Sequence, residues 1–208
     1  MSSRNPYNQL IAVTNRHFSD AAPAPEKAFL HRVREVLRLQ PRALVLREKD
    51  LSPQQYRALA EKVLQDAEGT RVPVILHGFP EVAAALGVKS VHLPLPALEA
   101  LSQENPLLLR RFSQIGTSVH SVSDAERAVS LGASYLFAGN VFETSCKPGL
   151  PARGLAFLEA VCAAVPVPVY GIGGVTPENL PLLLAAGAAG GCMMSGYFRD
   201  LTGRFSLP

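Results

Sequence analysis

Four histidines stand close to the ends of strand-like segments in this chain: His17, His77, His92 and His120. An imidazole can bind a metal ion or transfer a proton, because its unperturbed pKa of about 6.5 lies near neutrality. No two of the four have the short spacing of paired metal ligands, so we predict no metal site, and we expect His92 to be structural. His120 shares a strand face with Ser118 and directly precedes a helix start, so it is the candidate for proton transfer.

Two glycine-containing turns form a candidate phosphate site. The segment "YGIGGVTPEN" ends a strand at Gly173 and Gly174 and then enters a helix, and "MMSGYF" places Met194, Ser195 and Gly196 before a short final helix. Glycines let a backbone approach a ligand closely, and helix N-termini offer N–H groups and partial positive charge. We therefore predict that these turns bind phosphate, with tight turns that bind nothing as the alternative.

Cationic side chains follow two other strands. In "VLREKD" the period of two places Arg47 and Lys49 on one face, where they could hold a phosphate or a carboxylate. In "FETSCKPG" Thr144 and Lys147 lie in a loop where the lysine could cover an anionic ligand. The alternatives are a solvated charge cluster and an ordinary surface loop.

Eight short β-branched or aliphatic segments would position these groups: residues 9–15, 42–50, 71–78, 88–94, 113–121, 133–142, 167–174 and 189–196. Helical segments separate them, with apolar residues at helical spacing in residues 26–39. Ser52 before Pro53 and Thr176 before Pro177 predict helix starts, and Ser123 with Glu126 predicts a capping box. Strands that alternate with helices predict a (β/α)8 TIM barrel, with an open doubly wound sheet as the alternative. In such a barrel the chemistry lies at the carboxyl ends of the strands.

Length and composition bound the class of protein. The 208 residues are 48% hydrophobic, enough for a single domain over residues 1–208, with residues 1–8 expected to be frayed. A net charge of +3 without a basic stripe suits an anionic small molecule better than nucleic acid. Cys146, Cys162 and Cys192 are expected to be reduced thiols in a cytoplasmic protein, and no membrane span or secretion signal is indicated. A homodimer is left open.

The order of "LREKD", "GTSVHS", "GNVFETSCKPGLPARGL", "YGIGGVTPENL" and "GGCMMSGYF" resembles the thiamin phosphate synthase / TenI superfamily, over about residues 10–198. The resemblance implies the (β/α)8 barrel. It also implies one of two activities. Synthases join a pyrimidine pyrophosphate to a thiazole phosphate with Mg2+, whereas the TenI type includes thiazole tautomerases that need no metal.

Departures from the synthase pattern favour the TenI type. Where synthases carry Asn-Asp-Arg after the third strand, this chain has His77, Gly78 and Phe79. Where they carry Gly-Gln-x-Asp after the fourth, it has "PLPA" at residues 94–97. Both aspartates that hold the synthase metal are therefore missing, and Mg2+ is expected as a cofactor only if the protein is nevertheless a synthase. The segments "FETSCKPG" and "SVHS" look like the TenI type, whose tautomerases use the histidine of that motif as acid and base.

The resemblance implies a mechanism in which His120 moves a proton from ring C2 of a carboxylated dihydrothiazole ethyl phosphate to its exocyclic carbon. The ring becomes aromatic, which supplies the driving force. Gly173, Gly174, Ser195 and Gly196 would hold the phosphate, Arg47, Lys49 or Lys147 the carboxylate, and Ser118 and Thr144 would orient the ring. The alternatives are a thiamin phosphate synthase, a binding-only or regulatory TenI-like protein, and another phosphosugar-type barrel isomerase.

Overall fold

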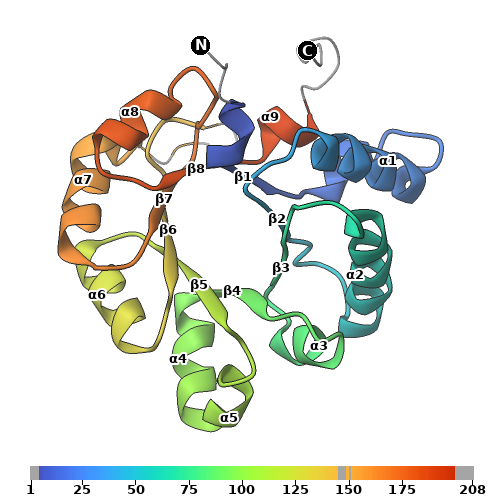
Figure 1. Ribbon diagram of the computed structural model, residues 1–208, viewed down its shortest axis with the longest axis horizontal. Coiled ribbons are helices and arrows are strands. Elements are labelled where there is room, and N and C mark those ends of the chain that lie inside the picture. Colours follow the sequence, from blue (N-terminus) through green and yellow to red (C-terminus); the bar gives the residue numbers. More distant parts are fainter. Residues whose placement is uncertain (1–4, 145–148, 150, 200–208) are drawn as a thin grey trace.

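The computed structural model describes residues 5–144, 149 and 151–199, and these form a closed parallel barrel. Its eight strands follow one another in chain order, and β1 pairs with both β2 and β8, which closes the ring (Figure 1). The strands are β1 (Leu10–Val13), β2 (Ala43–Leu46), β3 (Val74–His77), β4 (Ser90–Pro94), β5 (Gln114–Val119), β6 (Tyr135–Gly139), β7 (Val169–Ile172) and β8 (Gly190–Met193). The predicted (β/α)8 barrel is confirmed, and the alternative prediction of an open doubly wound sheet is wrong.

Helices surround the barrel and connect its strands. They are α1 (Pro25–Arg38), α2 (Pro53–Ala67), α3 (Pro80–Ala85), α4 (Leu95–Glu104), α5 (Pro106–Leu109), α6 (Val122–Ser130), α7 (Gly154–Ala164), α8 (Leu180–Ala185) and α9 (Ser195–Phe198), with 3-10 turns η1 (Pro6–Gln9) and η2 (Arg16–Ser19). Among the described residues, no helix combines the length and apolar character needed to cross a bilayer.

Two of the predicted helix starts differ from the structure. Ser121, not Ser123, caps α6, because its extended backbone lets its hydroxyl accept from the Asp124 N–H. Thr176 does begin a capping turn, in which its hydroxyl accepts from the Asn179 N–H, but α8 itself starts only at Leu180. The predicted start at Ser52 is confirmed, where Gln55 completes a capping box.

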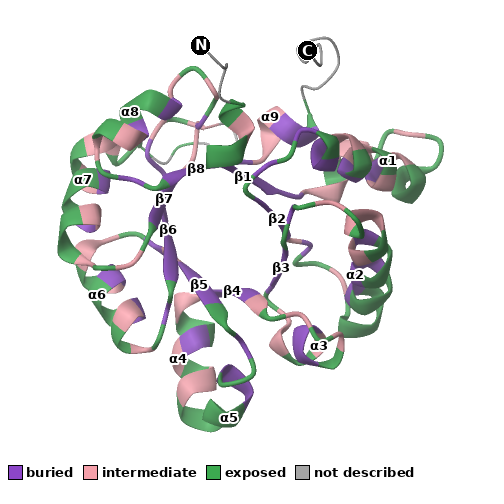
Figure 2. Ribbon diagram, viewed as in Figure 1, coloured by how far each residue is buried: buried purple, intermediate pink, exposed green. Residues whose placement is uncertain are grey.

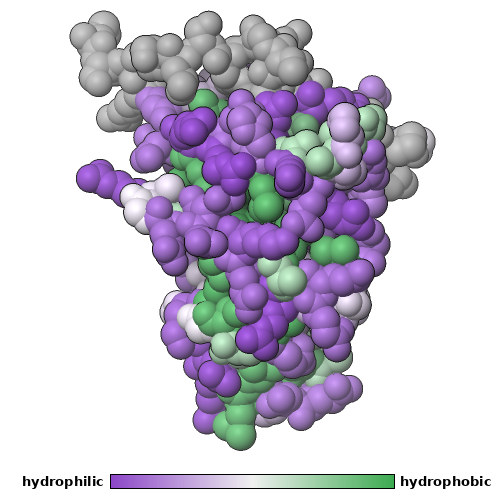
Figure 3. All heavy atoms as spheres, turned by 90° about the vertical axis from the view of Figure 1, so that its right-hand side faces the viewer, coloured by the Kyte–Doolittle hydropathy of each residue, from purple (hydrophilic) through white to green (hydrophobic). Residues whose placement is uncertain are grey.

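The apolar core lies in two layers. Alternate strand residues face outward against the helices, and the others fill the barrel interior, where Val45, Ile75, Tyr135, Phe137 and Tyr170 pack together. Buried residues accordingly concentrate on the strands and on the inner faces of the helices (Figure 2). The side of the molecule that carries α1 to α3 is largely hydrophilic on its outside, with apolar side chains between the polar ones (Figure 3). Inward-facing residues at the carboxyl ends of the strands therefore lie at the mouth of the barrel.

The start of the chain is more ordered than the sequence suggested. Residues 6–9 form η1, the Asn5 side chain donates to the Leu39 carbonyl, and the Tyr7 ring packs on Tyr197 with centroids 6.0 Å apart. Fraying is therefore the wrong expectation for residues 5–8, because this ring contact holds the segment, whereas residues 1–4 lie outside the described part of the chain.

Candidate active site

A cavity of about 530 Å3 opens at the carboxyl ends of the strands. Its wall includes nine of the residues predicted from sequence: Arg47, Lys49, Ser118, His120, Thr144, Gly173, Gly174, Met194 and Ser195. Gly196 is not brought to the wall, and a side chain at this position would overlap the Met193 sulfur. Lys147 and Cys146 lie outside the described residues. The fold thus gathers these nine groups from the ends of five strands, β2, β5, β6, β7 and β8, around one space.

His120 is held at the mouth between β5 and β6. Its backbone N–H donates to Oδ2 of Asp124 at 2.9 Å, in the first turn of α6. Its ring Nδ1 lies 2.7 Å from the carbonyl oxygen of Gly139. Since a carbonyl can only accept, Nδ1 carries the proton in this contact, and Nε2 of the neutral ring keeps its lone pair. The arrangement presents a base with a fixed tautomer to the cavity.

The glycine turn after β7 packs tightly against the loop after β6. Gly173 and Gly174 have φ of +97° and +65°, and the Gly173 carbonyl accepts from the Phe142 N–H at 3.0 Å. A side chain at Gly173 would overlap Asn140, so this close approach requires glycine. The turn and Ser195 both line the cavity. The loops after the seventh and eighth strands are where barrels of this type commonly bind phosphate.

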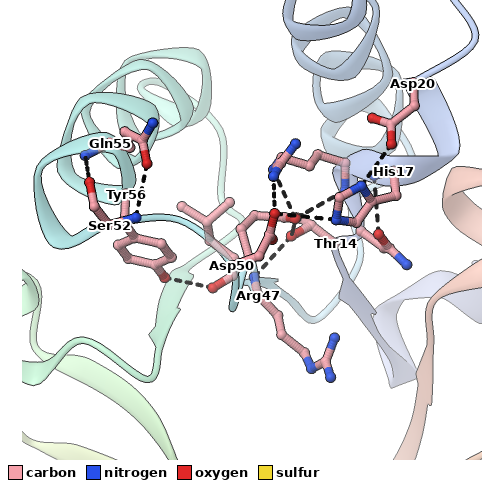
Figure 4. Close-up of polar contacts among 12 residues, drawn as sticks. Thr14, His17, Asp20, Arg47, Asp50, Ser52, Gln55 and Tyr56 are labelled. Carbon is pink, nitrogen blue, oxygen red and sulfur yellow. Dashed lines mark hydrogen bonds and ion pairs between the residues drawn. The ribbon is translucent and has the colours of Figure 1, made fainter.

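A buried carboxylate organises the tip of β2. Glu48 is 2% exposed, and its carboxylate accepts from the Thr14 hydroxyl at 2.6 Å and from the Arg16 N–H at 3.1 Å. The Thr14 hydroxyl in turn accepts from the Arg47 N–H at 2.9 Å, so the backbone of Arg47 is fixed while its side chain extends away from this cluster (Figure 4). The predicted alternation is confirmed: Val45 faces the interior, and Arg47 and Lys49 line the cavity.

Not every histidine near a strand end belongs to the cavity. His17 lies in η2, where its Nδ1 is 2.7 Å from Asp20 and its Nε2 is 3.4 Å from Asp50 (Figure 4). Asp50 also pairs with the Arg16 guanidinium. These contacts explain why the pKa of His17 is raised, chiefly by its hydrogen bond to Asp20, and they leave it in an exposed ion-pair cluster outside the cavity wall.

Sequence reasoning missed what His77 and His92 do. The His77 ring lines the cavity and stacks on His92 at 5.5 Å, and the buried His92 contacts Ser118 and Phe137. Burial lowers the pKa of both histidines, that of His77 to about 3, with Arg47 as a further cause in each case. Both are therefore neutral near pH 7. The alternation around His92 could have placed it inside the barrel, but not beside Ser118.

These depressed pKa values predict that acid destabilises the protein. Between pH 6.5 and 3 the unfolded chain binds a proton at His77 that the folded chain does not, so stability falls as pH falls. The unfolding free energy of the wild type should fall between pH 7 and pH 5, and we expect this fall to be about 2 kcal/mol smaller in His77→Asn. Urea titrations of both proteins measure it. The raised pKa of the buried Glu48 acts in the opposite direction, but it is common to both proteins and cancels in the comparison. Parallel pH profiles would contradict the prediction.

The described residues do not fit the Mg2+ that the synthase pattern implies. Magnesium prefers an octahedron of oxygen ligands that includes carboxylates. The described cavity wall contributes one carboxylate, Asp124, which already accepts from His120, while β3 ends in His77 and β4 in Pro94. Nor do the described residues hold any group of three His, Cys, Asp or Glu side chains placed for a metal.

Several other wall residues had no signal in the sequence. Asn140, Ile172, Cys192 and Val13 reach the cavity because the closed ring brings β1, β6, β7 and β8 to one mouth. Cys192 is a free thiol whose burial raises its pKa, as burial also does for Cys162. Nothing in the local sequence distinguishes these residues from ordinary core positions.

Comparison with known proteins identifies the family. The family model described as thiamine monophosphate synthase, TMP-TENI, matches residues 10–197. The chain is 31% identical over 185 residues to "Thiamine-phosphate synthase 2" of Streptococcus pneumoniae serotype 4, covering 88% of this chain and 83% of that protein. It is 37% identical over 165 residues to "Thiamine-phosphate synthase" of Thermus thermophilus, covering 78% and 77%.

A solved structure supports the fold. The thiamine phosphate pyrophosphorylase from Pyrococcus furiosus superposes with a TM-score of 0.77 at 24% identity, over 95% of this chain and 90% of that one. The two relatives carry the synthase name and the solved structure carries the name thiamine phosphate pyrophosphorylase. None of the three carries the TenI-type name that the motifs led us to expect. The match over residues 10–197 nonetheless spans every strand of the barrel, so the chain belongs to the thiamine monophosphate synthase (TMP-TENI) family.

Proposed function

We propose that this protein is a thiazole tautomerase that aromatises a carboxylated dihydrothiazole ethyl phosphate in thiamin biosynthesis. One observation carries the proposal: the His120 ring is fixed by Gly139 so that Nε2 presents a lone pair at the cavity. A histidine in this state can accept a proton and return it, and neither step needs a metal.

In the proposed reaction Nε2 of His120 takes the proton from ring C2. The electron pair of that C–H bond enters the ring, and the electrons of the exocyclic double bond take the same proton from the imidazolium at the exocyclic carbon. The ring gains aromaticity, and His120 returns to its starting state. The Gly139 carbonyl also stabilises the transient imidazolium, because Nδ1 keeps its donor contact throughout.

The anionic ends of the substrate would be held from two sides. Gly173, Gly174 and Ser195 would receive the phosphate, where backbone N–H groups and the start of α9 lie at the cavity wall. Arg47 and Lys49 on the other side supply positive charge for the carboxylate. The proposed ligand is therefore a small molecule with two separated anionic groups.

A second candidate, thiamin phosphate synthase, is supported by the names of the relatives, which favour it over the tautomerase. That transfer expels pyrophosphate, and the developing negative charge is ordinarily neutralised by Mg2+. The described carboxylates do not fit Mg2+, which weighs against this candidate. The proposed tautomerisation needs no metal and therefore no metal-binding carboxylates.

The two candidates can be separated in one set of assays. We expect the purified protein to convert the product of thiazole synthase to the aromatic tautomer, followed by NMR, faster than buffer does. A parallel reaction contains the pyrimidine pyrophosphate, thiazole phosphate and Mg2+, with the Thermus thermophilus relative as the positive control. Thiamin phosphate formation comparable with that control, without isomerisation, would replace the tautomerase with the synthase. Binding of thiazole phosphate without turnover in either assay would favour a binding-only protein.

A further inference from the structure

A chain of three hydrogen-bonding side chains runs through the barrel interior to the cavity. The Tyr135 hydroxyl lies 3.3 Å from Nδ1 of His92, and Nε2 of His92 lies 2.9 Å from the hydroxyl oxygen of Ser118. Ser118 lines the cavity beside His120, whereas His92 is 1% exposed. A buried imidazole thus connects the interior to a hydroxyl that a ligand can touch.

The strand register builds this chain. His92 of β4 pairs with Gly116 of β5, and Gly116 pairs with Tyr135 of β6, so the three lie in one row across the sheet. A side chain at Gly116 would overlap the Tyr135 ring, so glycine is what lets Tyr135 reach across β5 to His92. Ser118 stands two residues above Gly116 on the same face. The contact is therefore built by three adjacent strands.

The direction of the hydrogen bonds depends on what the ligand presents. A neutral histidine has one N–H, and each hydroxyl has one hydrogen to donate. Burial lowers the pKa of His92 well below its ordinary value, which keeps it in this neutral form. If Ser118 donates to a ligand, it must accept from Nε2–H of His92. Tyr135 must then donate its one hydrogen to Nδ1 of His92, 3.3 Å away, instead of to the Val91 carbonyl, 3.4 Å away. The reverse direction would make Ser118 an acceptor toward the ligand.

The charge of the cavity selects the first direction. Arg47 and Lys49 line the same space and disfavour a proton on His77, so their positive potential reaches the inner wall. An anionic oxygen attracted there can only accept a hydrogen bond, so a hydroxyl that contacts it must donate.

We infer that His92 is a positioning residue, whose Nε2–H turns the Ser118 hydroxyl hydrogen into the cavity to donate to the carboxylate of the ligand. This inference rests on the proposed function, because it assigns to the Ser118 hydroxyl a hydrogen bond to the carboxylate of the proposed substrate. It makes Ser118 a specificity determinant that distinguishes a 2-carboxythiazole phosphate from the same thiazole phosphate without the carboxylate.

The direction can be measured in the free wild-type protein. Long-range 1H–15N correlation spectra distinguish the two neutral histidine tautomers. We expect His92 to carry its proton on Nε2 and His120 to carry its proton on Nδ1. A proton on Nδ1 of His92 would overturn the inference, since Ser118 would then donate inward to His92 and would not be oriented toward a ligand. This measurement does not depend on turnover.

Binding by calorimetry tests the role of the hydroxyl, with 2-carboxythiazole ethyl phosphate and its decarboxylated analogue as probes. Ser118→Ala should raise the Kd of the carboxylated probe by about ten- to a hundredfold and that of the analogue little. His92→Phe keeps a ring on Phe137 and should reproduce this loss, whereas His92→Gln should restore affinity, since its amide can donate. Combining Ser118→Ala with His92→Phe should add little to either single loss.

Two results would contradict this role. If Ser118→Ala raises the Kd of both probes equally, or leaves the Kd of the carboxylated probe unchanged, the hydroxyl does not bind the carboxylate. If the wild-type protein binds neither probe, the proposed function fails as well, while the tautomer of His92 still decides the direction of the chain.

Discussion

Replacing His120 with alanine is expected to lower kcat/KM for the proposed tautomerisation by about a hundred- to ten-thousandfold. The reason is that the variant lacks the only ring in the described cavity wall whose Nε2 is set as a base by a carbonyl at Nδ1. NMR of the aromatising ring measures the rate. The Kd of the carboxythiazole product should change much less, since the residues proposed to bind its anionic ends remain in place.

His31→Ala is the matched control for this variant. His31 is exposed on α1 and is not part of the cavity wall, and its contact is an exposed pair with Glu35. The same change of residue type there should leave the rate unaltered. A His120→Ala protein that is folded, binds the product and still turns over at the wild-type rate would remove His120 from the mechanism.

Substituting Gly173 with alanine is expected to lower the free energy of unfolding by about 3 kcal/mol and to weaken phosphate binding by about tenfold or more. The backbone at φ +97° is costly for any L side chain, and the added Cβ would lie 2.5 Å from the Asn140 Cβ. Relief of that overlap must move the turn or the loop after β6, and both form the cavity wall. Urea titration measures the stability, and calorimetry with thiazole phosphate measures the affinity.

Gly132→Ala separates the two causes. Gly132 has φ +91°, nearly the same backbone conformation, but a Cβ there would meet no atom within 4 Å. We expect this variant to lose about 1–2 kcal/mol from backbone strain alone and to bind thiazole phosphate as the wild type does. Equal losses in the two variants would mean that the close approach at Asn140 contributes nothing, and unchanged binding by Gly173→Ala would argue against a phosphate at this turn.

Local sequence patterns predicted many of the residues that line the candidate site. The period of two along "VLREKD" and "GTSVHS" assigns Arg47, Lys49, Ser118 and His120 to the inner face once a parallel barrel is inferred, and all four line the cavity. Patterns at helix ends were less reliable, as the cap at Ser121 shows, since two serines three residues from an acidic partner compete and backbone geometry decides between them. The glycines that make the turn after β7 were recognisable because few residues tolerate such φ values.

Other features depended on contacts between segments far apart in the chain. His92 looks like a core residue from its neighbours Val91 and Leu93, and its Ser118 contact exists only because β4 and β5 pair in one register. The proton of His120 is placed by the Gly139 carbonyl, 19 residues away. The lowered pKa of His77 likewise needs both burial and the nearby cations.

By itself, then, the sequence determined the barrel, its strand order and the residue types at its mouth, because alternation, turn residues and βαβ spacing are local properties of a chain. Tertiary structure decided which of those side chains face one cavity, which histidines stay neutral, and in which direction a hydroxyl there can donate. Those properties depend on distances across strands and on exclusion of water, and both arise only when the ring of eight strands closes.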